Sequence, residues 1–425
     1  MTDTTATPMG VRDVLRIRDY RYLFAGQVVS DIGDGITLLL VLLVINHLTG
    51  STFALALMAI AEAVPAFSVG LIAGVYVDRW DRRRIMLATD LLRAGIVLSF
   101  AFVQTAALLP LFYVLGFTQA SVSTFFRPAR GALLPHIVPA EGLPAANSLA
   151  QGSQVIGSLI GAGIAGVLFS AFGSGMAGFA IDALTFLLSF ALISRISRDA
   201  GRITAEAHAA SRSAGMRDGI LEGLRIIRGS RVLAGVVLAA GVSMLGLGSV
   251  NVLFVPLLVT DLQVSPSWMA GIELAQTVGM LLAAALVAGV VRRMAPTTII
   301  TVGLAGIGVC IGLMSGISAI WQVLIILLAV GLLVTPLQAM LQTLVQTSAG
   351  DATRGRVVSL VQASMSTASV ASMAIGGVLG DLIGIRLVFL AAGAIVLVAA
   401  GVSFVMFRGV SGRASRAPAA FGEAA

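Results

Sequence analysis

Long apolar runs without a charged residue constrain this 425-residue chain more than any other feature. Such runs cover residues 94–126, 142–181, 232–260, 295–350 and 357–380. A helix needs about 20 apolar residues to cross a bilayer, so the run that begins at residue 295 is long enough for two crossings. Hydrophobic residues make up 58% of the chain and charged residues 11%, which is more apolar surface than an ordinary water-soluble core can bury. The sequence therefore predicts an all-α integral membrane protein.

Gly, Pro, Ser and charged residues interrupt the apolar runs and divide the chain into twelve predicted transmembrane helices. The helices are predicted to begin near Phe24, Ala54, Met86, Ala107, Ser148, Ala177, Val232, Trp268, Thr297, Ala319, Val357 and Leu387. An even number of crossings places both termini on one side. The 27 basic residues are all arginine, and all but two fall in the termini or in the even-numbered connections between predicted helices. Arg127 and Arg130 are predicted to lie in one of these connections. The positive-inside rule predicts that these segments are cytoplasmic, in a multi-pass protein of the cytoplasmic (inner) membrane.

The residue types that are missing exclude several mechanisms. Without lysine the chain can form neither a phosphate-binding P-loop nor a Schiff base, so no energy-coupling ATPase lies within it, and we expect no cofactor and no enzyme activity. The histidines His47, His136 and His208 fall in three separate loops, and Cys310 is the single cysteine, so no metal site is predicted. The net charge of +7 is spread over short loops, which indicates contact with anionic lipid and not with nucleic acid.

An internal repeat can be read from the sequence. Residues 148–168 and 359–379 share nine identities in 21 positions, and LIAGV at 71–75 matches LVAGV at 286–290. The fifth helix therefore corresponds to the eleventh and the second to the eighth, which predicts two parallel six-helix bundles that rock about a midplane site. The predicted domains are a cytoplasmic N-terminus (1–23), two bundles (24–194 and 232–408), a cytoplasmic linker between them (195–231) and a disordered tail (409–425).

A charged motif follows the second predicted helix. Gly74, Asp78, Arg79, Arg82 and Arg83 have the spacing G-x-x-x-D-R-x-x-R-R. This motif resembles the signature GxxxDRxGRR of the major facilitator superfamily, with an aspartate, residue 81, in place of the second glycine. The resemblance implies a cytoplasmic gate in which the loop faces the start of the eleventh helix near residue 356. A plain positive-inside signal would explain the arginines but not the glycine and the first aspartate.

Further segments are similar to one branch of this superfamily. VSDIGDG (29–35), FFRPARGALLPHIVP (125–139) and GDATRGRVVSL (350–360) resemble the macrolide-efflux and enterobactin-exporter branch of drug:proton antiporters. The small residues Gly157, Gly161 and Gly166 resemble the antiporter glycine motif GxxxGPxxGG, with alanine at 162 in place of proline. Close helix packing alone would also explain these glycines.

Polar residues inside the apolar helices mark the candidate site. Gln27, Ser30, Asp31 and Asp34 are spaced i, i+3, i+4 and i+7, so they share one face of the first helix. The insertion of an ionised side chain at the middle of the bilayer costs about 2.5–3.5 kcal/mol of free energy. An acidic residue at that depth is therefore a candidate functional residue. We expect these residues to line a cavity for proton coupling and substrate. The other candidates for that cavity are Glu62, Asp182, Glu273, Gln338 and Gln342, and Gln346 continues the glutamine spacing of the tenth helix.

One basic residue, Arg93, lies inside a predicted helix. Asp90 precedes it by three residues, so the sequence predicts an ion pair between the two near the cytoplasmic face, and Arg356 completes the predicted gate.

Together these features predict a secondary active exporter of amphipathic small molecules, a drug or a secreted metabolite, driven by proton antiport through alternating access. In this reading Asp34 or Glu62 takes up the proton. The expected partners are the small-molecule substrate, protons and membrane lipids, and the protein is expected to act as a monomer. The alternatives are a proton-coupled or facilitated importer or a lipid mover of the same fold, and a transport-inactive membrane scaffold or sensor.

Overall fold

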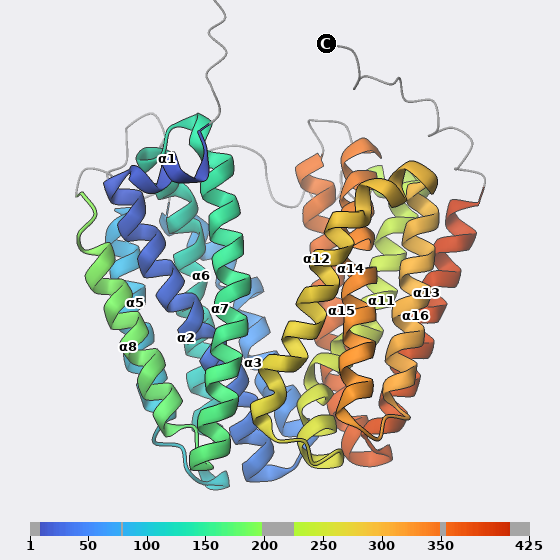
Figure 1. The fold of residues 1–425 in the computed structure, drawn as a ribbon, viewed down its shortest axis with the longest axis horizontal. Coiled ribbons are helices and arrows are strands. Elements are labelled where there is room, and N and C mark those ends of the chain that lie inside the picture. The colour runs from blue at the N-terminus through green and yellow to red at the C-terminus, as the bar shows by residue number, and fades with distance from the viewer. Residues whose placement is uncertain (1–8, 78–79, 198–224, 349–353, 409–425) are drawn as a thin grey trace, which may run out of the picture. The chain divides into compact units, whose positions relative to one another are not determined.

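The computed structural model describes residues 9–77, 80–197, 225–348 and 354–408, and in these ranges it contains helices and no strand (Figure 1). Ten of the described helices are long and apolar enough to cross a membrane. The predicted all-α membrane fold is therefore confirmed.

The described residues form two compact units. The first contains α1 (Val11–Arg16), α2 (Arg18–Thr49), α3 (Thr52–Ser68), α4 (Gly70–Val77), α5 (Arg82–Phe100), α6 (Leu109–Ile137), α7 (Leu143–Phe172) and α8 (Met176–Ile193), together with the segment Leu258–Gly271. The second contains α11 (Arg231–Pro256), α12 (Met269–Arg293) from Ile272 onward, α13 (Pro296–Met314), α14 (Ile320–Ser348), α15 (Arg354–Ile383) and α16 (Ile385–Phe407).

Helix packing inside each unit follows the internal repeat. In the first unit α2 packs against α7 and α8, and α5 packs against α6 and α8 (Figure 1). In the second unit α11 packs against α15 and α16, and α13 packs against α14 and α16. When the predicted transmembrane helices are numbered from one to twelve, each packed pair of the second unit is a packed pair of the first unit with six added to both numbers. The repeat in the sequence therefore corresponds to a repeated packing pattern in the structure.

Two predicted helices of the first unit depart from a simple apolar span. The second is divided into α3 and α4 at Val69, and Pro65 lies in the last turns of α3. The third, α5, carries charged residues and is not among the ten apolar helices. Asp81 caps α5, because its side chain accepts a hydrogen bond of 2.9 Å from the backbone N–H of Arg84. This cap explains why an aspartate can replace the motif's second glycine.

The glycines of α7 bring it close to α2. A Cβ atom at Gly157 would lie 2.6 Å from the Cβ of Asp31, and one at Gly161 would lie 2.7 Å from the Cα of Gly35. A Cβ at Gly166 would lie 2.9 Å from the carbonyl carbon of Pro266. No side chain fits at these positions, so the structure gives the three glycines the role of close packing. The packing at Gly157 and Gly161 positions α2, which carries the polar stripe, whereas Gly166 packs against Pro266.

An apolar cluster anchors α1 and one end of the long helices in the first unit. Val14 of α1, Leu23 of α2, Met86 of α5, Leu133 of α6 and Ala146 of α7 belong to it, and each is at most 2% exposed. This cluster packs together the helix ends next to the charged motif.

Arginines of the charged motif bind backbone carbonyl groups within the first unit. Arg82 donates to the carbonyl oxygen of Ala132 near the end of α6 (3.1 Å), and Arg83 donates to that of Ser194 after α8 (2.5 Å). A cation near a helix C-terminus is favourable because the helix dipole is negative there. Both arginines therefore stabilise helix ends of their own unit.

The predicted gate itself stays a prediction. Asp78 and Arg79 lie outside the described residues, and Gly74 and Arg356 are described only as residues of α4 and α15, without their side-chain surroundings.

Candidate functional site

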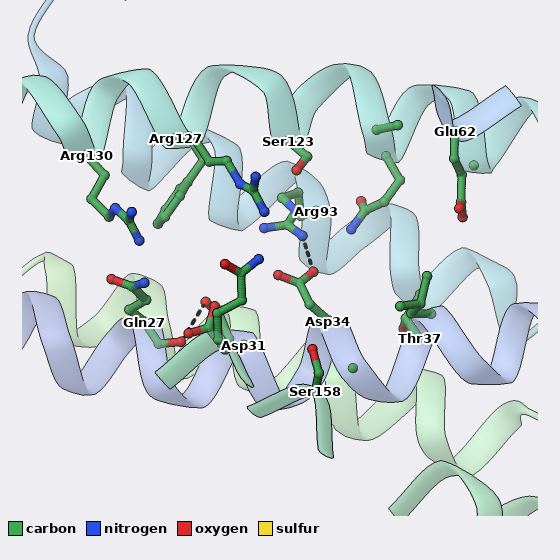
Figure 2. A pocket seen from close by; sticks show the side chains of 18 residues that line it. Gln27, Asp31, Asp34, Thr37, Glu62, Arg93, Ser123, Arg127, Arg130 and Ser158 are labelled. Carbon is green, nitrogen blue, oxygen red and sulfur yellow. Dashed lines mark hydrogen bonds and ion pairs between the residues drawn. The ribbon is translucent and has the colours of Figure 1, made fainter. Parts of the chain in front are cut away.

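A polar cavity of about 410 Å³ lies within the first unit (Figure 2). All four polar residues of the α2 stripe line it, as their spacing predicts: Gln27, Ser30, Asp31 and Asp34. Glu62 of α3 also lines the cavity, together with Arg93 of α5 and Arg127 and Arg130 of α6. Its volume is in the range of small-molecule sites. The cavity thus combines three acids and three arginines in one apolar bundle.

Asp34 forms an ion pair and a hydrogen bond with Arg93, which links α2 to α5 across the cavity (Figure 2). The side chain of Arg93 is 7% exposed and that of Asp34 is 46% exposed, so the acid is open to the cavity and the base is mostly buried in the cavity wall. The guanidinium group also lies 4.1 Å from the ring centre of Phe186 of α8, a favourable cation–π contact. The predicted pairing of Arg93 with Asp90 is wrong, because the tertiary partner on α2 takes its place.

Asp90 and Asp182 are fully buried acids behind the cavity wall. Asp90 accepts a hydrogen bond of 2.7 Å from the hydroxyl of Ser189. Asp182 of α8 does not line the cavity but accepts hydrogen bonds from the hydroxyls of Thr37 (2.5 Å) and Thr185 (3.0 Å). Because Thr37 lines the cavity, one side chain separates Asp182 from it. Asp182 is therefore a neighbour of the site and not part of its surface.

Asp31 and Glu62 occupy different parts of the cavity. Asp31 accepts a hydrogen bond of 2.6 Å from the hydroxyl of Ser153 on α7. Glu62 lies beside α6 at Gly116, where a Cβ atom would be 3.9 Å from the Cγ of Glu62. Figure 2 shows Glu62 at the opposite end of the cavity from Arg130. The acids are thus spread along the cavity and do not form one cluster.

Arg127 and Arg130 are site residues that the sequence reasoning missed. It placed them in a cytoplasmic loop, whereas they belong to the helix α6 and line the cavity. Their spacing of three residues puts them on one face of a helix, and that spacing was the available signal. The cavity therefore carries more positive charge than the sequence analysis predicted.

The second unit places its candidate residues in two separate cavities. Glu273 lines a cavity of about 310 Å³ together with Asn251, Gln276 and Cys310. Gln338 and Gln342 line another cavity of about 510 Å³. The side chain of Gln346 lies outside the description. Within this unit, therefore, the acid and the glutamines do not share one site. Among the described residues of the whole chain, no group of three His, Cys, Asp or Glu could hold a metal ion.

Comparisons with known proteins agree with the fold and the repeat. The model of the Major Facilitator Superfamily matches residues 23–353 and 236–424. The MFS-type transporter YfiS of Bacillus subtilis (strain 168) is 30% identical over 387 residues, which cover 88% of this chain and 89% of that protein. The multidrug efflux pump Tap of Mycobacterium tuberculosis (strain H37Rv) is 28% identical over 84% of this chain and 86% of its own length. Macrolide efflux protein A of Streptococcus pyogenes is 26% identical over 88% and 92%.

Solved transporter structures share the fold. A bacterial homologue of the iron transporter ferroportin, solved in an inward-facing state, superposes with a TM-score of 0.74 at 17% sequence identity. The superposition covers 92% of this chain and 99% of that chain. At this identity the likeness concerns the fold alone.

Proposed function

The chain belongs to the major facilitator superfamily, and we propose that it is an exporter of amphipathic small molecules driven by proton antiport. Membership makes it a multi-pass membrane transporter of small molecules and not an enzyme. We further propose that it lies in the cytoplasmic membrane with both termini in the cytoplasm, because nearly all the arginines outside the cavity fall on the side that the positive-inside rule assigns to the cytoplasm. Export is supported by the relatives whose names describe efflux.

The ion pair between Asp34 and Arg93 is the single observation that carries the coupling proposal. Its acid is 46% exposed toward the cavity, so a proton can reach it, whereas its base is buried and held over the ring of Phe186. A proton on Asp34 removes the negative charge and breaks the ion pair. The free energy of the pair therefore depends on the protonation of a group that faces the cavity.

Such a dependence can drive alternating access. A proton shifts the equilibrium between two conformations only when it binds one of them better than the other. In our proposal Asp34 takes up the proton while the cavity is open to the outside and releases it to the cytoplasm when the cavity is open inward. The substrate enters from the cytoplasm after that release and leaves outward before the next proton binds. Glu62, which faces the same cavity, is the second candidate for the proton carrier.

The proposed function is tested with the purified full chain in sealed vesicles. A pH gradient is imposed, and the movement of the amphipathic dye rhodamine 123 is followed together with that of protons. We expect the dye to move uphill, in the direction opposite to the protons, and to stop when an ionophore collapses the gradient. Movement of dye and protons in the same direction would instead indicate an importer. No gradient-dependent flux across a panel of drugs and dyes would contradict the antiport proposal and leave a facilitated importer, a lipid mover or a transport-inactive scaffold.

A further inference from the structure

Two arginines at one end of the first unit's cavity have a role that proton coupling does not require. We propose that Arg127 and Arg130 form an anion-binding subsite for an acidic group, such as a carboxylate, on an amphipathic substrate. The inference rests on the proposed transport function, because it assigns part of the substrate to part of the same cavity. It narrows the substrate class from amphipathic molecules in general to those that carry an acid.

The first argument is that these two arginines lack an ion-pair partner. In the described ranges, neither Arg127 nor Arg130 has a carboxylate oxygen within 4.0 Å, whereas Arg93 is paired with Asp34. The neighbouring acid Asp31 is bound by the hydroxyl of Ser153. Even with Asp31 ionised, two cations face one anion at this end of the cavity. The local excess of positive charge attracts an anionic ligand group.

The second argument is geometric. The two residues are three apart on α6, so their side chains leave the helix on the same face and line the same cavity. Figure 2 shows Arg130 directed toward Gln27 of α2 and Arg127 directed toward Arg93 and Asp34. Guanidinium groups offer planar pairs of N–H donors that match the two oxygens of a carboxylate. Two of them on one wall of the cavity can together bind one acidic group.

The third argument is that the remaining acid of the cavity is too far away to neutralise these arginines. Glu62 lies beside Gly116 of α6, eleven residues before Arg127. At 1.5 Å per residue this corresponds to about 16 Å along the helix. The cavity is therefore polarised, with two arginines and the single acid Asp31 at one end and Glu62 at the other.

The test uses two dyes that differ only in the acid. Rhodamine 110 carries a free carboxyl group, and rhodamine 123 is its methyl ester. Binding of each dye to the purified full chain in detergent is measured by fluorescence polarisation, for the parent and for Arg127→Gln, Arg130→Gln and the corresponding lysine variants. Arg21→Gln changes an exposed arginine of α2 outside the cavity and serves as the matched control.

We expect the parent to bind rhodamine 110 more tightly than rhodamine 123. Each glutamine variant should weaken the binding of rhodamine 110 about tenfold, equivalent to about 1.4 kcal/mol, and should not weaken the binding of rhodamine 123, which carries a positive charge and no acid. The lysine variants, which keep the charge, should recover part of the loss, and Arg21→Gln should change neither dye.

Two results would overturn the subsite. One is a parent that does not bind rhodamine 110 or does not prefer it to the ester. The other is an equal loss for both dyes, which is what a merely structural or topological role of the arginines produces. Failure of the transport proposal looks different, because the preference for the acid would persist in binding while neither dye moved with the pH gradient in vesicles.

Discussion

Breaking the ion pair between Asp34 and Arg93 should destabilise the protein asymmetrically. Asp34→Asn leaves the guanidinium group of Arg93 without its counter-ion at a side chain that is 7% exposed. Arg93→Gln leaves a carboxylate that is 46% exposed and can be hydrated through the cavity. Because an uncompensated charge is costly in proportion to its burial, the second substitution should rescue the first. The double variant is therefore expected to be more stable than Asp34→Asn alone.

The burial of the pair sets the magnitude. Removing one partner of a fully buried pair costs about 3–5 kcal/mol, and an exposed pair contributes only about 0.2–1 kcal/mol. This pair is buried on one side only, so we expect a coupling energy of about 1–3 kcal/mol between the two positions. Loss of the contact between Arg93 and Phe186 affects both variants that lack the arginine and cancels in the cycle.

The four proteins of the cycle are purified in detergent, and their thermal unfolding is followed by tryptophan fluorescence. A second cycle with Asp90→Asn in place of Asp34→Asn gives the comparison, because Asp90 is bound by Ser189 and, among the described residues, interacts with the charge of Arg93 without forming an ion pair. Additivity of the Asp34 cycle within about 0.5 kcal/mol, or a larger coupling for Asp90, would refute the pairing.

Three further substitutions test the packing around the site, each by thermal unfolding of the purified protein. Gly161→Ala should lower stability by about 1–3 kcal/mol because its methyl group meets the backbone of α2, whereas Gly152→Ala, with open space around it on the same helix, should not. Asp81→Ala should cost about 1 kcal/mol by removing the cap of α5, and Asp81→Asn should keep most of it. Thr37→Val should cost about 1–3 kcal/mol because it takes a hydrogen-bond donor from the buried Asp182, and Thr37→Ser should restore it.

Helix positions could be predicted from the sequence because they depend on local composition. Each of the twelve predicted spans corresponds to described helix, and the second is interrupted after Pro65. The shared face of Gln27 and Asp34 was also predictable, because residues seven apart lie on one side of a helix. These predictions needed only the composition and the periodicity of a single helix.

Contacts between helices could not be read in the same way. The sequence suggested Asp90 as the partner of Arg93 because the two are three residues apart, but the partner is on another helix, 59 positions away. Arg127 and Arg130 were assigned to a loop because arginine in a short polar stretch usually reports topology. Their position in a helix facing α2 depends on how α6 packs, and no local pattern shows that.

Uphill export by Asp34→Asn tests the central claim most directly. The parent and the variant are reconstituted into sealed vesicles at equal density, and the accumulation of rhodamine 123 is measured with and without an imposed pH gradient. If Asp34 carries the proton, the variant should be inserted and should bind the dye, yet it should accumulate none of it against a concentration gradient. An Asp34→Asn protein that still concentrates the dye with the parent's dependence on pH would contradict the account and direct attention to Glu62.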